Sequence, residues 1–144
     1  MKAFIVKKFG SWKNLELVDL REREIFPNYA KIKVEFIGLN FADLMQREGV
    51  YPKTPKPPFV PGLEGAGLIE EVGNGLDKNL IGKRAVAFPI FGSHSDYIFT
   101  DKFIEIPEDM KLEEASAIGV QGLTAYYSLA KLGNPEEGEK VLIT

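Results

Sequence analysis

The sequence predicts a mainly β fold with helices in its C-terminal third, and three observations support this. Short apolar runs separated by Gly, Asn, Asp or Pro recur through residues 15–107, a spacing typical of a barrel or sandwich. Segments with helical spacing follow between 109 and 133. The run at 140–144, "KVLIT", then has the composition of a fully buried strand.

The clearest strand is predicted at 29–38, where apolar and charged residues alternate. Ile32, Val34 and Phe36 take every second position, which is the period of a strand with one solvated face. Further strands are predicted at 15–20, 67–72, 84–90, 96–100 and 103–107. Pro89 implies an edge, a bulge or a break in the strand that contains it.

A first helix is predicted at 41–48. Asn40 can cap it, Asp43 favours its positive N-terminal end, and Gly49 can close it. Asp43 and Arg47 lie four residues apart, a spacing that predicts a structural ion pair.

Two further helices are predicted after the strands. One runs from a cap at Asp109 to Gly119, and the second covers 121–133 with Gly133 as its stop. The second has the i, i+3, i+4, i+7 spacing of one buried face. The residues of that predicted face are Leu123, Tyr126, Tyr127 and Ala130.

Composition excludes several classes of protein. Apolar residues make up 44% and charged residues 27% of the chain, which is a globular composition. A net charge of -3 with scattered basic residues argues against nucleic-acid binding. The absence of cysteine excludes disulfides and thiolate sites and fits a cytoplasmic location. The stretch 115–130 is too short and too polar to insert in a membrane.

Three stretches carry a family resemblance: "GLNFADLMQREGVYP" (38–52), "PGLEGAGLIEEVG" (61–73) and "VQGLTAYYSLAKLG" (120–133). In this order the chain resembles the N-terminal GroES-like catalytic domain of medium-chain dehydrogenases/reductases, in the zinc-independent quinone oxidoreductase branch. The first stretch also looks like the vesicle-membrane-protein homologues of that branch. The resemblance implies a partly open β-barrel with short helices over 1–110. It implies a helical connector and the first strand of an incomplete Rossmann unit over 111–144.

The resemblance also implies a cofactor site beyond the C-terminal strand. In relatives such a strand leads into a glycine-rich turn and a helix, which hold the pyrophosphate of a dinucleotide. No residue follows Thr144, and "GLEGAG" (62–67) lacks both a preceding strand and a following helix. We therefore expect a truncated chain that binds NADPH or NADH weakly or not at all, although the complete enzyme would use one of them.

The resemblance places the catalytic zinc ligands of metal-dependent relatives at Asn40, Leu63 and Val120. Leu63 and Val120 cannot ligate a metal and Asn40 is a poor zinc ligand, so a metal-free site is predicted. Glu64 is interpreted as a structural ion pair or as a cap of backbone N–H groups. His94 is interpreted as a surface-loop residue, with a proton shuttle as the alternative.

The resemblance assigns roles to four residues, each with a structural alternative. Asn40 would approach the nicotinamide and the substrate, or cap the helix. Phe41 would line the pocket, or belong to the core. Thr124 would touch the nicotinamide, or bond a helix carbonyl. Tyr51, at the lip of a proline-rich loop, would contact the oxygen or ring of the acceptor, or only pack.

Two interpretations of function remain open. The first is the substrate-side catalytic domain of an NAD(P)H-dependent quinone or enone oxidoreductase, which needs a Rossmann half, here absent or supplied by a partner chain. Met45, where close relatives often have a tyrosine, puts carbonyl recognition at that position in doubt. The second is a stand-alone GroES-like binding or scaffold module without catalysis. In both, unpaired apolar surface near the C-terminus predicts a homo-oligomer.

Overall fold

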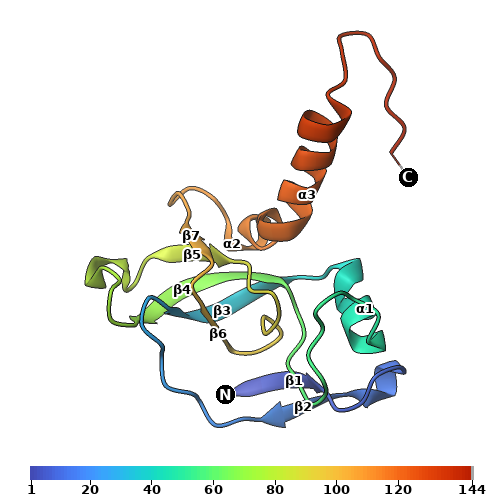
Figure 1. The fold of residues 1–144 in the computed structure, drawn as a ribbon. Helices are drawn as coiled ribbons and strands as arrows, with labels where there is room; N and C mark the ends of the chain where they lie inside the picture. Colours follow the sequence, from blue (N-terminus) through green and yellow to red (C-terminus); the bar gives the residue numbers. More distant parts are fainter. Residues whose placement is uncertain (144) are drawn as a thin grey trace.

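The fold is built on two antiparallel sheets (Figure 1), and the computed structural model describes residues 1–143. In the smaller sheet β1 (Lys2–Val6) pairs with β2 (Leu15–Asp19). The larger sheet has the order β6-β3-β4-β5-β7. Its strands are β3 (Ala30–Gly38), β4 (Glu64–Val72), β5 (Arg84–Ala87), β6 (Tyr97–Thr100) and β7 (Phe103–Glu105). The mainly β fold is confirmed, although β1 is not among the strands predicted from the sequence.

Strand β1 also pairs with two loops outside the sheets. Single antiparallel bridges join Ala3 to Ser95 and Val6 to Phe59. Pro89 falls just after β5, so the predicted strand at 84–90 breaks at Ala87. Short 3₁₀ turns, η1 (Trp12–Asn14) and η2 (Lys78–Leu80), occupy two of the connections.

The core consists of two clusters packed against the larger sheet. Ile32, Ile69 and Ile98 come from three neighbouring strands and are almost completely buried. Burial of one such side chain contributes about 1.5–3 kcal/mol. A second cluster, which includes Ala66, Val86, Leu112 and Ala115, packs α2 (Leu112–Ala115) against the sheet.

The alternation predicted for 29–38 holds only in the first half of β3. The pairing of β3 with β4 shifts register between Lys31 and Ile32 and again between Val34 and Phe36. Such a bulge changes which face the following side chains occupy. Phe36 is 40% exposed, and its predicted place on the buried face is wrong.

Helix α1 (Phe41–Glu48) has the predicted limits. Asn40 has extended backbone angles at the N-cap, and Gly49 closes the helix in the left-handed conformation at φ 80°. Gln46, which is buried, fixes α1 to two loops. Its Nε2 donates to Ile90 O at 3.1 Å, and its Oε1 accepts from the Gly62 N–H at 3.3 Å.

The C-terminal helices differ from the prediction in their boundaries. Helix α2 begins after Lys111 rather than Asp109, because the residues before it form a turn in which the Met110 N–H donates to Pro107 O. It is short, and Gly119 lies inside the next helical stretch rather than at a helix end. That stretch forms one rod (Figure 1), made of η3 (Ile118–Gly122), α3 (Leu123–Tyr126) and η4 (Tyr127–Gly133).

The rod projects from the sheets (Figure 1) and its predicted buried face is exposed. Leu123 is 49% exposed, and Tyr126 and Tyr127 are each 58% exposed. Helical spacing predicted that these apolar residues share one face of the helix. It also predicted that the face is buried, which is wrong, because no other described element packs over it.

Residues 140–143 do not form the predicted strand, and Thr144 lies outside the described residues. A strand requires a partner for its backbone groups, and none pairs with this segment among residues 1–143. Leu142 and Ile143 are 86% and 87% exposed.

Candidate active site

A buried carboxylate, that of Glu64, lies at the centre of the candidate site. Its Oε1 accepts hydrogen bonds from Asn40 Nδ2 at 2.9 Å and Gln121 Nε2 at 3.3 Å. Its Oε2 accepts from the Val120 backbone N–H at 2.6 Å. The side chain is completely buried, and no Lys, Arg or His lies within ion-pair distance of it in residues 1–143. The backbone-capping interpretation of Glu64 is therefore confirmed, and the ion-pair interpretation is wrong.

This network connects three elements that are distant in sequence. Glu64 begins β4, Asn40 precedes α1, and Val120 lies in the first turn of the C-terminal rod. Hydrogen bonds to an ionised group contribute about 1.5–3 kcal/mol each when they replace bonds to water. The carboxylate therefore holds the start of the rod against the barrel beside Asn40.

The network is possible only because the chain approaches itself closely at Gly38. A Cβ atom at this position would lie 2.5 Å from Glu64 Oε1 and 2.5 Å from the Ser116 carbonyl oxygen. Any side chain here would displace either the carboxylate or the backbone that follows α2.

Asn40 and Phe41 line a cavity of about 450 Å³ next to the network. Phe41 is 77% exposed, so the interpretation of Phe41 as a core residue is wrong. The remaining walls come from α1 and from three other segments of the barrel. The other lining residues are Leu15, Leu39, Asp43, Leu44, Arg47, Pro61 and His94.

Thr124 lines a different cavity, an open groove of about 810 Å³ along the rod. Gly119 and Val120 form the end of this groove nearest to Glu64. No hydrogen bond joins the Thr124 hydroxyl to a helix carbonyl in the described part of the chain. Thr124 is connected to Asn40 through the rod, which is bonded to Glu64 and, by Gln121 Nε2, to the Leu39 carbonyl oxygen at 3.1 Å.

Tyr51 lies apart from both cavities. It starts the loop after Gly49, and its carbonyl oxygen accepts from Thr54 Oγ1 at 2.6 Å. Its side chain is half-buried and is not among the residues that line the Asn40 cavity or the Thr124 groove. The structure thus brings Asn40 and Phe41 together, with Thr124 nearby on the rod and Tyr51 elsewhere.

His94 is buried, so its predicted place on the surface is wrong. Its Nε2 lies 3.6 Å from Asp43 Oδ2, and the two side chains are only 8% and 7% exposed. The backbone explains the burial, because the Phe4 N–H donates to His94 O and the His94 N–H donates to Pro61 O. These contacts are long-range, and no local pattern in "FGSHSDY" could have revealed them.

Asp43 is used differently from the prediction. Its Oδ2 accepts from the Asn40 backbone N–H at 2.8 Å, as expected of an acidic residue in a first helical turn. Arg47 pairs with Glu48 at 2.7 Å instead of with Asp43, so the predicted pair is wrong. Asp43 thus binds the backbone N–H of Asn40, and Glu64 binds the side chain of Asn40.

Comparison with known proteins gives the family. The sequence profile of the alcohol dehydrogenase GroES-like domain matches residues 27–133. The chain belongs to this family. The human synaptic vesicle membrane protein VAT-1 homolog-like is 36% identical over 145 residues, and a bovine quinone oxidoreductase-like protein 2 is 32% identical over 132 residues.

Solved structures of this family have the same fold. The human VAT-1 homolog-like protein superposes with a TM-score of 0.89 at 35% identity, over 96% of this chain and 45% of that one. The quinone oxidoreductase of Thermus thermophilus, solved also in complex with NADPH, gives a TM-score of 0.82 at 37% identity over 99% of this chain and 44% of that one. The resemblance to the quinone oxidoreductase branch is confirmed.

This GroES-like domain spans about a third of the length of the curated relatives it matches. The match to the human VAT-1 homolog-like protein covers 99% of this chain but 35% of the relative, and the match to the bovine protein covers 90% of this chain but 38% of the relative.

The family resemblance assigns the catalytic zinc ligands of metal-dependent relatives to the positions of Asn40, Leu63 and Val120. Only Asn40 has a side chain that can coordinate a metal, and its Nδ2 is bonded to Glu64. Across residues 1–143 no three His, Cys, Asp or Glu side chains are grouped so as to hold a metal ion.

Within residues 1–143 no helix is both long and apolar enough to cross a membrane.

Proposed function

We propose that this GroES-like domain is the substrate side of a metal-free, NAD(P)H-dependent quinone or enone reductase. The single observation that carries the proposal is the Glu64 network, which holds Asn40 beside the start of the rod that bears Thr124. The quinone oxidoreductases among the solved relatives, including complexes with NADPH from Escherichia coli and Thermus thermophilus, support it.

The network gives Asn40 a defined orientation. Because Nδ2 donates to Glu64, the amide is held in one orientation with Oδ1 as its acceptor end. A fixed amide dipole lowers the reorganisation needed when a substrate or cofactor amide binds. We assign to Asn40 the contact with the nicotinamide and the substrate.

Phe41 and Thr124 complete the proposed cofactor face. The exposed ring of Phe41 forms an apolar wall of the cavity, and Thr124 presents a hydroxyl in the adjoining groove. The nicotinamide, when bound, supplies the hydride, so the protein has to position the acceptor and exclude water. Tyr51 is proposed as the acceptor contact from the 50–61 loop.

We expect the Thr124 groove to receive only the nicotinamide end of a dinucleotide. Residues 62–67, the only glycine-rich candidate, run into β4 and are not followed by a helix. We expect purified chain to bind NADPH or NADH more weakly than about 1 μM, because backbone N–H groups at a helix N-terminus supply much of dinucleotide recognition. Titration of cofactor fluorescence measures this, and micromolar or tighter affinity would contradict it.

Fusion to a nucleotide-binding half tests the function directly. We would join residue 144 to the nucleotide-binding half of the Thermus thermophilus quinone oxidoreductase, a 37% identical relative, and follow NADPH oxidation with 1,4-benzoquinone. Turnover is expected, and Asn40→Ala should lower kcat/KM by about tenfold or more, equivalent to about 1.4 kcal/mol. Lys78→Ala, exposed and free of ion pairs in the described residues, is the control. A fusion that binds NADPH without reducing the quinone would refute the proposal.

A non-catalytic binding or scaffold module is the second candidate. It is favoured by the exposed apolar face of the rod, which is a surface suited to contact with another protein. The fusion separates the two candidates, since a module would fold and bind without turnover.

A further inference from the structure

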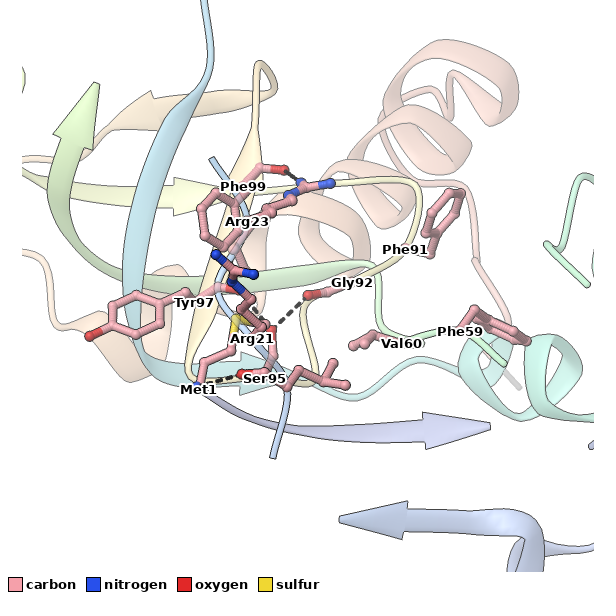
Figure 2. Close-up of a pocket in the computed structure, with 12 residues that line it drawn as sticks. Met1, Arg21, Arg23, Phe59, Val60, Phe91, Gly92, Ser95, Tyr97 and Phe99 are labelled. Atoms are coloured by element: carbon pink, nitrogen blue, oxygen red, sulfur yellow. Dashed lines mark hydrogen bonds between the residues drawn. The ribbon is translucent and has the colours of Figure 1, made fainter. Parts of the chain in front are cut away.

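A third cavity, of about 320 Å³, lies on another part of the barrel (Figure 2). It is enclosed by the segment before β3, residues 59–60, the loop before β6, and β6 itself. None of its lining residues lines the Asn40 cavity or the Thr124 groove. Its volume is within the range of small-molecule sites, roughly 300–1,000 Å³.

Two arginines give this cavity its side-chain charge, and Met1, whose α-ammonium donates to Leu20 O at 2.9 Å, lines it as well. Arg21 and Arg23 both line it, and no Asp or Glu does. Neither guanidinium lies within 4.0 Å of a carboxylate in residues 1–143. The intervening Glu22 is held by Lys31 at 2.8 Å, so it does not neutralise them.

The two arginines have different tasks. Arg23 is fixed, because its Nη2 donates to the Phe99 carbonyl oxygen at 2.9 Å and its guanidinium lies 4.8 Å from the centre of the Phe99 ring. Arg21 makes no side-chain hydrogen bond within the described residues. Arg21 therefore keeps the planar set of donors that suits a carboxylate.

Aromatic rings share the apolar wall with Met1, Leu20, Val60 and Ile98. Figure 2 shows Arg23 beside Phe99 on one side and Phe59 and Phe91 on the other. The hydroxyl of Ser95 already donates within its own loop, at 3.0 Å to Gly92 O and 2.7 Å to Tyr97 O. The Arg21 guanidinium and the rings of Phe59 and Phe91 thus remain for recognition, because Arg23 already lies against the Phe99 ring.

We propose that this cavity binds an aromatic carboxylate, with its acid group on Arg21 and its ring among Phe59, Phe91 and Phe99. Rings prefer edge-to-face and offset contacts with other rings, which favours an aromatic body over an aliphatic one. The carboxylate supplies the negative charge that the cavity lacks. The site is separate from the proposed reductase site, and its occupancy does not depend on that function.

The test uses naphthalene-2-acetate and its neutral amide, naphthalene-2-acetamide, titrated into purified chain and followed by ¹H–¹⁵N spectra. We expect the acid to bind with Kd of about 0.1–1 mM, as its size allows, and to shift the resonances of Tyr97 and Phe99. The amide should bind at least about fivefold more weakly than the acid, because it has the same ring without the charge.

Arg21→Ala is the decisive variant, since this side chain has no hydrogen bond or ion pair in the described residues whose loss would unfold the chain. It should weaken binding of the acid about fivefold and leave the amide unchanged. Lys78→Ala removes the same charge elsewhere and should change neither. Arg23→Ala should weaken both ligands, because it disturbs the aromatic wall. Equal binding of acid and amide, unchanged affinity in Arg21→Ala, or no shifts at about 5 mM acid, well above the expected Kd, would each overturn the proposal.

Discussion

Glu64 shows how one residue can determine the geometry of the whole site. Its carboxylate receives three neutral donors and no countercharge within residues 1–143. Neutral donors satisfy a buried carboxylate only when several of them are placed correctly, so their geometry is tightly specified. Orientation of Asn40 and attachment of the rod therefore depend on the same atoms.

Replacement of Glu64 by glutamine should weaken this attachment. The new amide group would face the Val120 N–H or the amide donors of Asn40 and Gln121, and one donor would lose its acceptor. We expect Glu64→Gln to lower the free energy of unfolding by about 1–3 kcal/mol and to speed hydrogen exchange at the Val120 amide. Urea unfolding and exchange spectra measure both. Glu71→Gln, an exposed change on the same strand, is the control, and equal effects of the two variants would contradict the role of Glu64.

Gly38 should tolerate no side chain. A Cβ atom there would lie 2.5 Å from both Glu64 Oε1 and Ser116 O, and the second of these is backbone that cannot rotate away. Gly38→Ala is expected to cost about 1–3 kcal/mol in unfolding free energy, measured by urea denaturation. A variant as stable as the parent would show that the two segments are not held this closely.

At the scale of elements, Lys31 connects β3 to its neighbours. Its Nζ pairs with Glu22 at 2.8 Å and with Glu70 at 3.0 Å, and its side chain is 13% exposed. Burial by itself lowers the pKa of Lys31, but the hydrogen bonds to Glu22 and Glu70 outweigh it, so the pKa is raised.

A raised lysine pKa stabilises the fold fully below the unfolded-state value, about 10.4, and this stabilisation is lost as pH rises through the folded-state pKa. Lys31→Met should cost about 1 kcal/mol at pH 8, a modest value because both glutamates are partly exposed. The difference from the parent should shrink above about pH 10.4. Urea unfolding of both proteins from about pH 8 to 11.5, a range that brackets the unfolded-state value, tests this, and a constant difference would contradict it.

Two glycines of the rod, Gly119 and Gly122, should respond differently to replacement by alanine. At Gly122 the nearest atom to a new Cβ is 3.4 Å away, and its φ of -63° and ψ of -46° suit any residue. Gly122→Ala should therefore increase helicity, with a gain of about 0.4–1 kcal/mol. At Gly119 the Cβ would lie 3.2 Å from Phe88 Cδ1, so that gain should be reduced or reversed. Circular dichroism in the far ultraviolet during thermal unfolding compares them, and identical changes would be inconsistent with this packing.

The sequence predicted elements where the signal was local and missed features made by distant contacts. Helix α1 was predicted with its limits because Asn40, Asp43 and Gly49 mark its ends within the segment itself. The exposure of Phe36 depends on register shifts against β4, and the burial of His94 depends on backbone bonds to distant segments. Neither contact leaves a local trace in the chain.

For the whole molecule, the candidate site also combines residues marked by a local motif with residues brought together by distant contacts. The resemblance assigned Asn40 and Phe41 to a site, and the structure places both at one cavity, while the shared acceptor Glu64 became evident only when three distant segments were assembled. An amphipathic pattern indicates that a face needs cover, but not which element supplies it. The uncovered face of the rod shows this limit most clearly.

The same uncovered face predicts how the molecule behaves in solution. Leu123, Tyr126 and Tyr127 lie on the rod and are about half exposed, and Leu142 and Ile143 are almost fully exposed. Contiguous apolar surface and unpaired extended backbone both favour association. We therefore expect the purified chain to self-associate reversibly as its concentration rises.

Sedimentation velocity and light scattering from about 10 μM to 1 mM, a span in which associations of ordinary strength become visible, test this expectation. Leu123→Lys with Tyr127→Lys should shift the protein toward monomer, because charge on the face must be desolvated when two copies meet. Lys8→Glu with Lys78→Glu, two exposed changes away from the rod, should not. A strict monomer at the highest concentration, or equal shifts in both double variants, would show that this face is not the contact.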